Sequence, residues 1–170
     1  YPRNTGIGVE LDTELHSIPI GKGEILRHGE DVAILAIGVT VTPALEAARE
    51  LSLKGIESTV VNARFAKPLD ARLILDLASN IKRMVTVEEN ALRGGFGSGV
   101  ACLLHESGIN DVQVKNIGLP DEFVEHGTQA VLRNKYGLDA KGIVKQVLSL
   151  VPVAERNSLI SVPKIEEWKN

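Results

Sequence analysis

The run VAILAIG, residues 32–38, constrains the fold of this chain more than any other segment. It is a continuous apolar stretch of strand length that ends in glycine. Such runs are typical of strands buried on both faces of a parallel sheet. RMVTVEEN, residues 83–90, begins with the same apolar character and predicts a further buried strand.

Helical patterns separate the predicted strands. In VTPALEAARELSLKG, residues 41–55, Thr42 is predicted to cap a helix, Pro43 to occupy its first position and Gly55 to stop it. Asp70 and Asp139 are predicted to cap two later helices. Further strands are expected at 24–27, 58–65 and 112–118, and further helices at 71–79, 97–107, 128–137 and 140–151.

Alternating strands and helices predict an α/β fold in three layers, with a mostly parallel sheet of about five strands and helices on both faces. We interpret residues 1–23 as a linker from a preceding domain, residues 24–151 as the α/β domain and residues 152–170 as a tail. In that tail, Leu159, Ile160 and Trp168 are candidates for packing on a neighbour. The chain begins at Tyr1 rather than at methionine, which indicates that preceding residues were removed or are not included.

Composition argues against several classes of function. The net charge is -3 and aromatic residues are 4% of the chain, so neither a basic surface nor stacking platforms for nucleic acid are indicated. One cysteine, Cys102, excludes an internal disulfide and a thiolate zinc site. The sequence contains neither a secretory signal nor an apolar run of the roughly 20 residues that a membrane span requires.

The segment TVEENALRGGFGSG, residues 86–99, has the order strand, glycine loop, helix that nucleotide-binding turns use. Its glycines are spaced G-x-G-x-G, whereas a dinucleotide fold needs G-x-G-x-x-G and a P-loop needs a closing Gly-Lys-Ser/Thr. The spacing therefore favours a packing role for the glycines. A helix N-terminus at this point would still offer N–H groups to an anion, including a carboxylate from a partner subunit.

Four other side chains are weighed as candidates for chemistry. Glu88 and Glu89 are adjacent, so on a strand they point to opposite faces and form a poor acid/base pair; a buried structural role or a cap is favoured. Ser98 does not have the context of a nucleophile elbow. His126 is kept as a candidate catalytic histidine, with a loop role as the alternative.

Five segments in order resemble one family: YPRNTGIGVE, PIGKGEILRHGEDVAILAIG, ARFAKPLD, TVEENALRGGFGSGV and NIGLPDEFVEHGTQ. Together they are similar to the C-terminal third of the 1-deoxy-D-xylulose 5-phosphate synthases, thiamine-diphosphate enzymes of the transketolase family. The resemblance runs from Tyr1 to about Val151. It implies the fold of the transketolase C-terminal domain. It also implies that this domain supports assembly of a homodimer.

The resemblance also implies an activity for the whole enzyme, which condenses pyruvate with D-glyceraldehyde 3-phosphate and loses carbon dioxide. The product feeds isoprenoid, thiamine and pyridoxal synthesis. Thiamine diphosphate and Mg²⁺ would be bound by preceding domains, so this piece alone is expected to bind neither and to be inactive. Arg3, in the family's Tyr-Pro-Arg segment, is expected to hold the phosphate of the aldehyde substrate. Asn4 stands where the family usually has glycine.

Two alternatives stay open at this stage. One is the last domain of another member of the superfamily, such as transketolase or the β subunit of a 2-oxo acid dehydrogenase. The other is a non-catalytic interaction or regulatory module. The expected location is the cytoplasm for a bacterial source and the plastid for a eukaryotic one.

Overall fold

The central layer of the protein is a five-stranded sheet with the order β1-β3-β2-β4-β5, in a computed structural model that describes residues 17–152. Strands β2 to β5 are parallel and β1 pairs antiparallel with β3. The strands are β1 (Glu24–Arg27), β2 (Val32–Ala36), β3 (Ser58–Asn62), β4 (Arg83–Ala91) and β5 (Gln113–Leu119). This confirms the predicted α/β class with a mostly parallel sheet.

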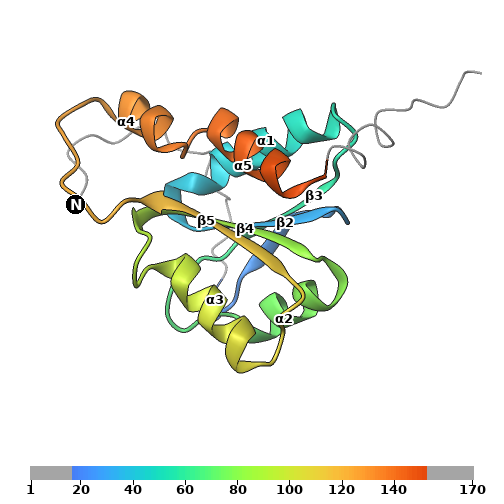
Figure 1. The fold of residues 1–170 in the computed structure, drawn as a ribbon. Helices are drawn as coiled ribbons and strands as arrows, with labels where there is room; N and C mark the ends of the chain where they lie inside the picture. The colour runs from blue at the N-terminus through green and yellow to red at the C-terminus, as the bar shows by residue number, and fades with distance from the viewer. Residues whose placement is uncertain (1–16, 153–170) are drawn as a thin grey trace, which may run out of the picture.

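Helices cover both faces of the sheet, α1, α4 and α5 on one side and α2 and α3 on the other (Figure 1). A short 3-10 helix, η1, precedes the first of them. The helices are η1 (Gly38–Thr40), α1 (Val41–Ser52), α2 (Ala71–Asn80), α3 (Phe96–Glu106), α4 (Gln129–Tyr136) and α5 (Ala140–Leu150).

The central strand β2 explains why both faces need cover. Its side chains alternate between two hydrophobic clusters: Val32 and Ile34 lie in the cluster beneath α1 and α5, and Ala33 and Leu35 in the cluster above α2 and α3. All of β2 is at most 1% exposed. Burial of a Val, Ile or Leu side chain contributes roughly 1.5 to 3 kcal/mol to stability. The continuous apolar run of β2 therefore stabilises the packing on both faces of the sheet.

Several helices begin where the sequence predicts. A side-chain oxygen of the capping residue accepts a hydrogen bond from the backbone N–H three residues further on. The distances are 3.3 Å for Asp70, 3.4 Å for Thr128 and 2.9 Å for Asp139. The predicted caps at Asp70 and Asp139 are confirmed.

The predicted start of α1 is wrong. The helix begins at Val41, so Thr42 lies in its second position and Pro43 in its third, and neither has the predicted role. The residue that fixes the start is Thr40, whose hydroxyl lies 2.9 Å from the carbonyl oxygen of Val87 on β4. A contact between distant segments therefore sets this boundary.

The strand predicted at 58–65 is also too long. β3 ends at Asn62, whose side-chain oxygen accepts a hydrogen bond from the Arg64 N–H at 3.1 Å. Arg64 has a positive φ of 58°, which a continuing strand does not allow.

Because β2 to β5 are parallel, their carboxyl ends meet along one side of the sheet, here called the carboxyl edge. Its loops are residues 37–40, 63–70, 92–95 and 120–128. The leading segment, residues 17–23, joins the same edge, since the Gly23 N–H donates to Asp70 at 3.2 Å. The opposite side, the amino edge, consists of residues 28–31, 53–57, 81–82 and 107–112.

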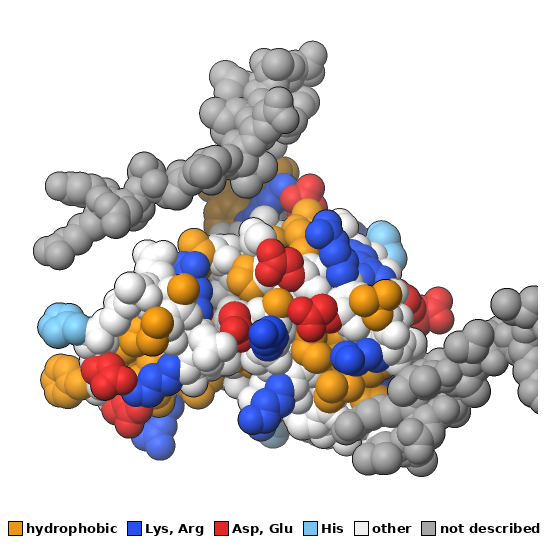
Figure 2. Space-filling model, turned by 90° about the horizontal axis from the view of Figure 1, so that it is seen from above, with side chains coloured by type: hydrophobic (Ala, Val, Ile, Leu, Met, Phe, Trp, Pro, Cys, Tyr) orange, Lys and Arg blue, Asp and Glu red, His pale blue; other side chains and the backbone are white. Residues whose placement is uncertain are grey.

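The outer surface above α1, α4 and α5 carries basic and acidic side chains interspersed with apolar ones (Figure 2). A mixed surface of this kind lacks the one-signed potential that nucleic-acid binding uses. Within residues 17–152, no helix has the length and apolar character needed to cross a membrane.

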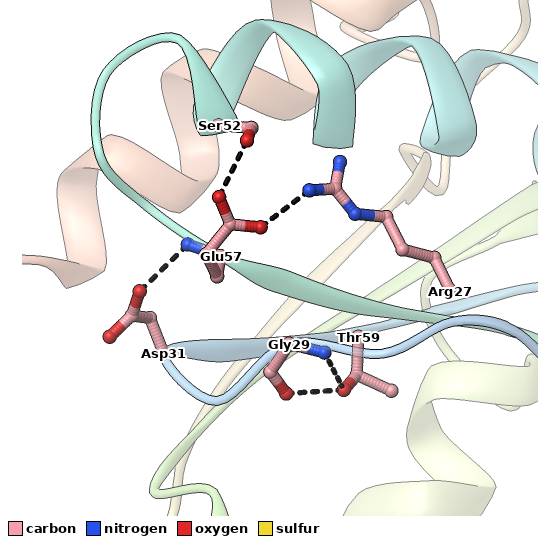
Figure 3. A network of polar contacts seen from close by, with 6 residues as sticks. All are labelled: Arg27, Gly29, Asp31, Ser52, Glu57 and Thr59. Carbon is pink, nitrogen blue, oxygen red and sulfur yellow. Dashed lines mark hydrogen bonds and ion pairs between the residues drawn. The ribbon is translucent and has the colours of Figure 1, made fainter.

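At the amino edge, polar side chains pair with one another around Glu57 (Figure 3). Its two carboxylate oxygens accept hydrogen bonds from Arg27 and Ser52, each at 2.5 Å. Its backbone N–H donates to Asp31 at 2.7 Å. This network ties β1, the loop after it and the end of α1 to the start of β3.

Candidate functional site

The carboxyl edge contains a cleft of about 800 Å³ between the ends of β2 and β4. From β2 the chain continues into α1 on one face of the sheet, and from β4 into α3 on the other face. This divergence is the topological switch point at which open α/β sheets usually bind ligands. Gly38 and Val39 form one wall, and Glu88, Gly95 and Phe96 belong to the other.

Glu88 occupies the place where a nucleotide-binding fold would hold a phosphate. Its Oε2 accepts a hydrogen bond from the Phe96 N–H at 2.7 Å and its Oε1 accepts one from the Gly97 N–H at 2.8 Å. The residue is only 2% exposed. The amide groups that open α3 therefore already bind an anion, and that anion belongs to the same chain rather than to a partner subunit.

Glu89 has the opposite surroundings. It is exposed and accepts a hydrogen bond from the Arg133 Nε on α4 at 2.8 Å. The prediction that Glu88 and Glu89 point to opposite faces is confirmed, and so is the favoured structural role for the buried one. The two carboxylates do not form an acid/base pair.

The glycines of the loop permit this close arrangement. Gly94 has a φ of +75°, which L-residues with a side chain rarely adopt. A Cβ on Gly95 would lie 2.7 Å from the Glu88 Cδ, and a Cβ on Gly97 would lie 2.8 Å from the Asn116 Cγ. The packing interpretation of the glycines is confirmed, because side chains here would displace the buried carboxylate and the strand beneath it.

Two potential nucleophiles line the same cleft. The Ser98 hydroxyl donates to the Leu92 carbonyl oxygen at 2.6 Å and accepts from the Gly94 N–H at 3.2 Å, so it closes the turn. Cys102 is hydrogen-bonded to Glu106 at 3.3 Å, and that bond and the negative charge raise the pKa of the thiol. Among residues 17–152, neither side chain has a hydrogen-bond partner that would activate it as a nucleophile.

Of the remaining predicted candidates, the structure describes His126. It lies exposed in the loop between β5 and α4 and is not among the residues that line this cleft. Arg3 and the tail residues Leu159, Ile160 and Trp168 lie outside the described residues. Among residues 17–152 there is no group of three or more His, Cys, Asp or Glu side chains placed to hold a metal ion.

Sequence reasoning missed the second wall of the cleft. The glycine spacing drew attention to the loop after β4, and it did not mark the turn at Gly38 as part of a site. The sequence did contain a usable signal, since two buried strands each end in a loop that leads to a helix. Such strands can lie side by side, and a switch point forms where their helices diverge.

Comparison with known proteins agrees with this geometry. Residues 21–143 match the family model described as the transketolase C-terminal domain. The chain is 59% identical over 143 residues to 1-deoxy-D-xylulose-5-phosphate synthase 1 of Geobacter sulfurreducens, covering 84% of this chain and 22% of that protein. It is 55% identical over 152 residues to the synthase of Dehalococcoides mccartyi, covering 89% of this chain and 24% of that protein.

Two solved structures show the same fold. One is described as a split-gene transketolase in an inactive β4 tetramer; it has a TM-score of 0.73 and 38% identity over 78% of this chain and 43% of that one. A transketolase mutant from Pichia stipitis has a TM-score of 0.54 and 18% identity, covering 76% of this chain and 18% of that one, which supports the fold alone. The chain spans less than a quarter of the length of the two synthases it matches. On these grounds the chain belongs to the transketolase C-terminal domain family.

Proposed function

We propose that this chain is the C-terminal domain of a 1-deoxy-D-xylulose 5-phosphate synthase. The whole enzyme would condense pyruvate with D-glyceraldehyde 3-phosphate, with loss of carbon dioxide, to give 1-deoxy-D-xylulose 5-phosphate. The observation that carries this proposal is the 59% identity over 143 residues to a synthase of that name. The relatives reported above are bacterial, which favours the cytoplasm as the place of action.

Thiamine diphosphate and Mg²⁺ would supply the carbanion chemistry of such an enzyme. The described residues do not form a binding site for thiamine diphosphate, because the helix N-terminus at the switch point is already capped by Glu88. By this proposal the cofactor and metal are held by the portion of the enzyme that precedes this chain. The role of this domain is then to support assembly of the homodimer, and the domain alone is inactive.

The test is an assay of the full-length enzyme from the same source. With pyruvate, D-glyceraldehyde 3-phosphate, thiamine diphosphate and Mg²⁺, it should form 1-deoxy-D-xylulose 5-phosphate, while the 170-residue chain forms none. The rival function is transketolase activity, which the 38% identity to a split-gene transketolase raises. Ketol transfer between sugar phosphates without use of pyruvate would refute the proposal in favour of that rival.

We further propose that Arg3 binds the phosphate of D-glyceraldehyde 3-phosphate in the full-length enzyme. A guanidinium group offers phosphate two parallel hydrogen bonds, and loss of a charge-assisted contact costs about 1.5 to 3 kcal/mol. Arg3→Ala should therefore raise the KM for the aldehyde roughly tenfold to a hundredfold and leave the KM for pyruvate nearly unchanged. Arg93→Ala is the matched control, since Arg93 is 87% exposed and pairs only loosely with Asp121. An equal rise in both KM values would refute the assignment.

A further inference from the structure

Phe123 is the most exposed large hydrophobic residue that the structure describes. Its relative exposure is 106%, as high as that of a residue in an open chain. It lies in the loop between β5 and α4, on the carboxyl edge of the sheet. An aromatic side chain held fully in water contributes nothing to this domain, and exposed apolar groups of this size are typical of contact surfaces.

Exposed ion pairs flank Phe123 on both sides of its loop. Asp121 lies 4.0 Å from Arg93 in the loop after β4, and Glu125 pairs with Lys135 on α4. The Lys135 ammonium holds the pKa of Glu125 below its usual range. These pairs engage two of the three acidic residues around Phe123, and the charge of the third, Glu122, also helps to raise the pKa of Lys135.

Other exposed apolar side chains lie along the same edge of the sheet. Ile18 and Ile20 stand on the leading segment, Val39 follows β2, and Val124 is next to Phe123. By contrast, the amino edge exposes Leu53, at the end of α1. Seen from above, hydrophobic, acidic, basic and histidine side chains protrude together at the left end of the molecule, where Figure 1 places the loop after β5 (Figure 2).

The leading segment, residues 17–23, is held at this edge. Lys22 and Gly23 of the leading segment both bind Asp70, each at 3.2 Å, in the loop after β3. More than three quarters of the length of the matched synthases lies outside the aligned region. By the proposed function, a preceding domain is joined to this segment through residues 1–16, which gives it a high effective concentration beside the carboxyl edge.

We infer that Phe123 is a docking residue that inserts into an apolar pocket on the preceding domain of the same polypeptide. The inference rests on the proposed function only in taking this chain as the C-terminal part of a longer enzyme. It names the residue that joins the domains and the chemistry of the surface that receives it.

Hydroxyl-radical footprinting of the wild-type full-length enzyme tests this directly. The oxidation rate at Phe123 is measured by mass spectrometry and normalised to the same peptide in the urea-unfolded enzyme. Leu53, which is 90% exposed on the amino edge, is the internal control. We expect strong protection of Phe123, because a side chain inserted into a pocket loses most of its accessible surface, and little protection of Leu53. Equal oxidation of the two residues would overturn the inference.

Dilution separates the preceding domain from other occupants. Protection that persists when the subunits dissociate supports docking within one polypeptide. Protection that disappears with dissociation assigns the pocket to a partner subunit or to a second copy of this domain, and it overturns the inference as stated. This readout does not depend on turnover, so an enzyme without synthase activity but with a protected Phe123 would refute the proposed function alone.

Matched variants of the full-length enzyme give a second measurement. Phe123→Ala should lower the midpoint of its thermal unfolding, whereas Leu53→Ala should leave the midpoint unchanged. Phe123→Leu should recover most of the loss, because the receiving pocket recognises apolar volume. If Phe123→Ala and Leu53→Ala behave alike, Phe123 is an ordinary exposed residue and the inference is wrong.

Discussion

The two edges of the sheet use their polar groups differently. At the amino edge, Glu57 is half exposed and binds Arg27 and Ser52 at the surface. At the carboxyl edge, Glu88 is buried and satisfies the amide groups of a helix that would otherwise bind a ligand. In this chain, the switch point where open α/β sheets usually bind a ligand is thus filled by a carboxylate of the chain itself.

The difference predicts where substitutions will be costly. A surface carboxylate exchanges its protein contacts for water at little cost, whereas removal of a buried one leaves its partners without acceptors. Stability should therefore depend strongly on the carboxyl edge and weakly on the amino edge.

The largest effect is expected from Glu88→Ala. It leaves the N–H groups of Phe96 and Gly97 buried without acceptors, which should lower the free energy of unfolding by roughly 2 to 5 kcal/mol. Glu89→Ala removes the neighbouring carboxylate, which is 40% exposed, and should cost less than about 1 kcal/mol. Urea unfolding of the 170-residue chain measures both. Similar losses for the two variants would remove the distinction between buried and exposed carboxylates on this strand.

Gly97→Ala should have the next largest effect. The added Cβ meets the Thr86 hydroxyl and lies 2.8 Å from the Asn116 Cγ, and these two side chains are hydrogen-bonded to each other at 2.8 Å. We expect a loss of about 1 to 3 kcal/mol from overpacking.

Gly99→Ala is the control in the same helix. Its Cβ would lie 3.4 Å from a Leu69 methyl group, an ordinary contact, so better helix propensity should stabilise the protein by up to about 1 kcal/mol. Thermal and urea unfolding of the two variants should therefore shift in opposite directions. A shift in the same direction would show that Gly97 is not needed to let α3 lie close to the Thr86 and Asn116 side chains.

What the sequence could predict depends on how local the cause is. The caps at Asp70 and Asp139 follow from bonds to amide groups three residues away, and both were predictable. The start of α1 was not, because Thr40 is held by Val87, 47 residues further along the chain. The end of β3 is an exception, because its cause is local: the Arg64 N–H donates to the Asn62 side chain, and the apolar pattern that continues to residue 65 did not reveal it.

The candidate site shows the same limit. Strand alternation predicts that Glu88 and Glu89 point to opposite faces, but the phase of the pleat that buries Glu88 depends on the neighbouring strands. The glycine spacing excludes the known phosphate loops. It does not identify Glu88 as the anion that takes the place of the phosphate. That identification depends on how the chain turns between the end of β4 and the start of α3.

Asp70 should give a smaller, pH-dependent effect. Burial raises the pKa of this carboxyl, but hydrogen bonds from the N–H groups of Leu73 and Gly23 and from Lys22 outweigh it, so the pKa is lowered. A lowered folded-state pKa means that the stabilisation is fully present above the unfolded value of about 3.9 and is lost as the pH falls through the folded value.

Asp70→Ala should accordingly cost about 1 kcal/mol at pH 7, as for loss of a helix cap, and less as the pH falls below about 4. Asp76→Ala, in the same helix but 71% exposed, is the control and should show little change at any pH. The measurement is urea unfolding across the acid range. A constant difference between Asp70→Ala and the native chain down to the lowest pH would contradict the lowered pKa.

The smallest effect is expected at the amino edge, from Glu57→Ala. The variant loses the contacts to Arg27 and Ser52, but Glu57 is 49% exposed and water replaces them, so the loss should stay within about 1 kcal/mol. A double-mutant cycle with Arg27→Ala should give a coupling energy of about 0.2 to 1 kcal/mol, falling with added salt. A loss as large as that of Glu88→Ala would mean that the surface network stabilises the sheet as strongly as the buried carboxylate does. The stability of the fold would then depend on both edges equally.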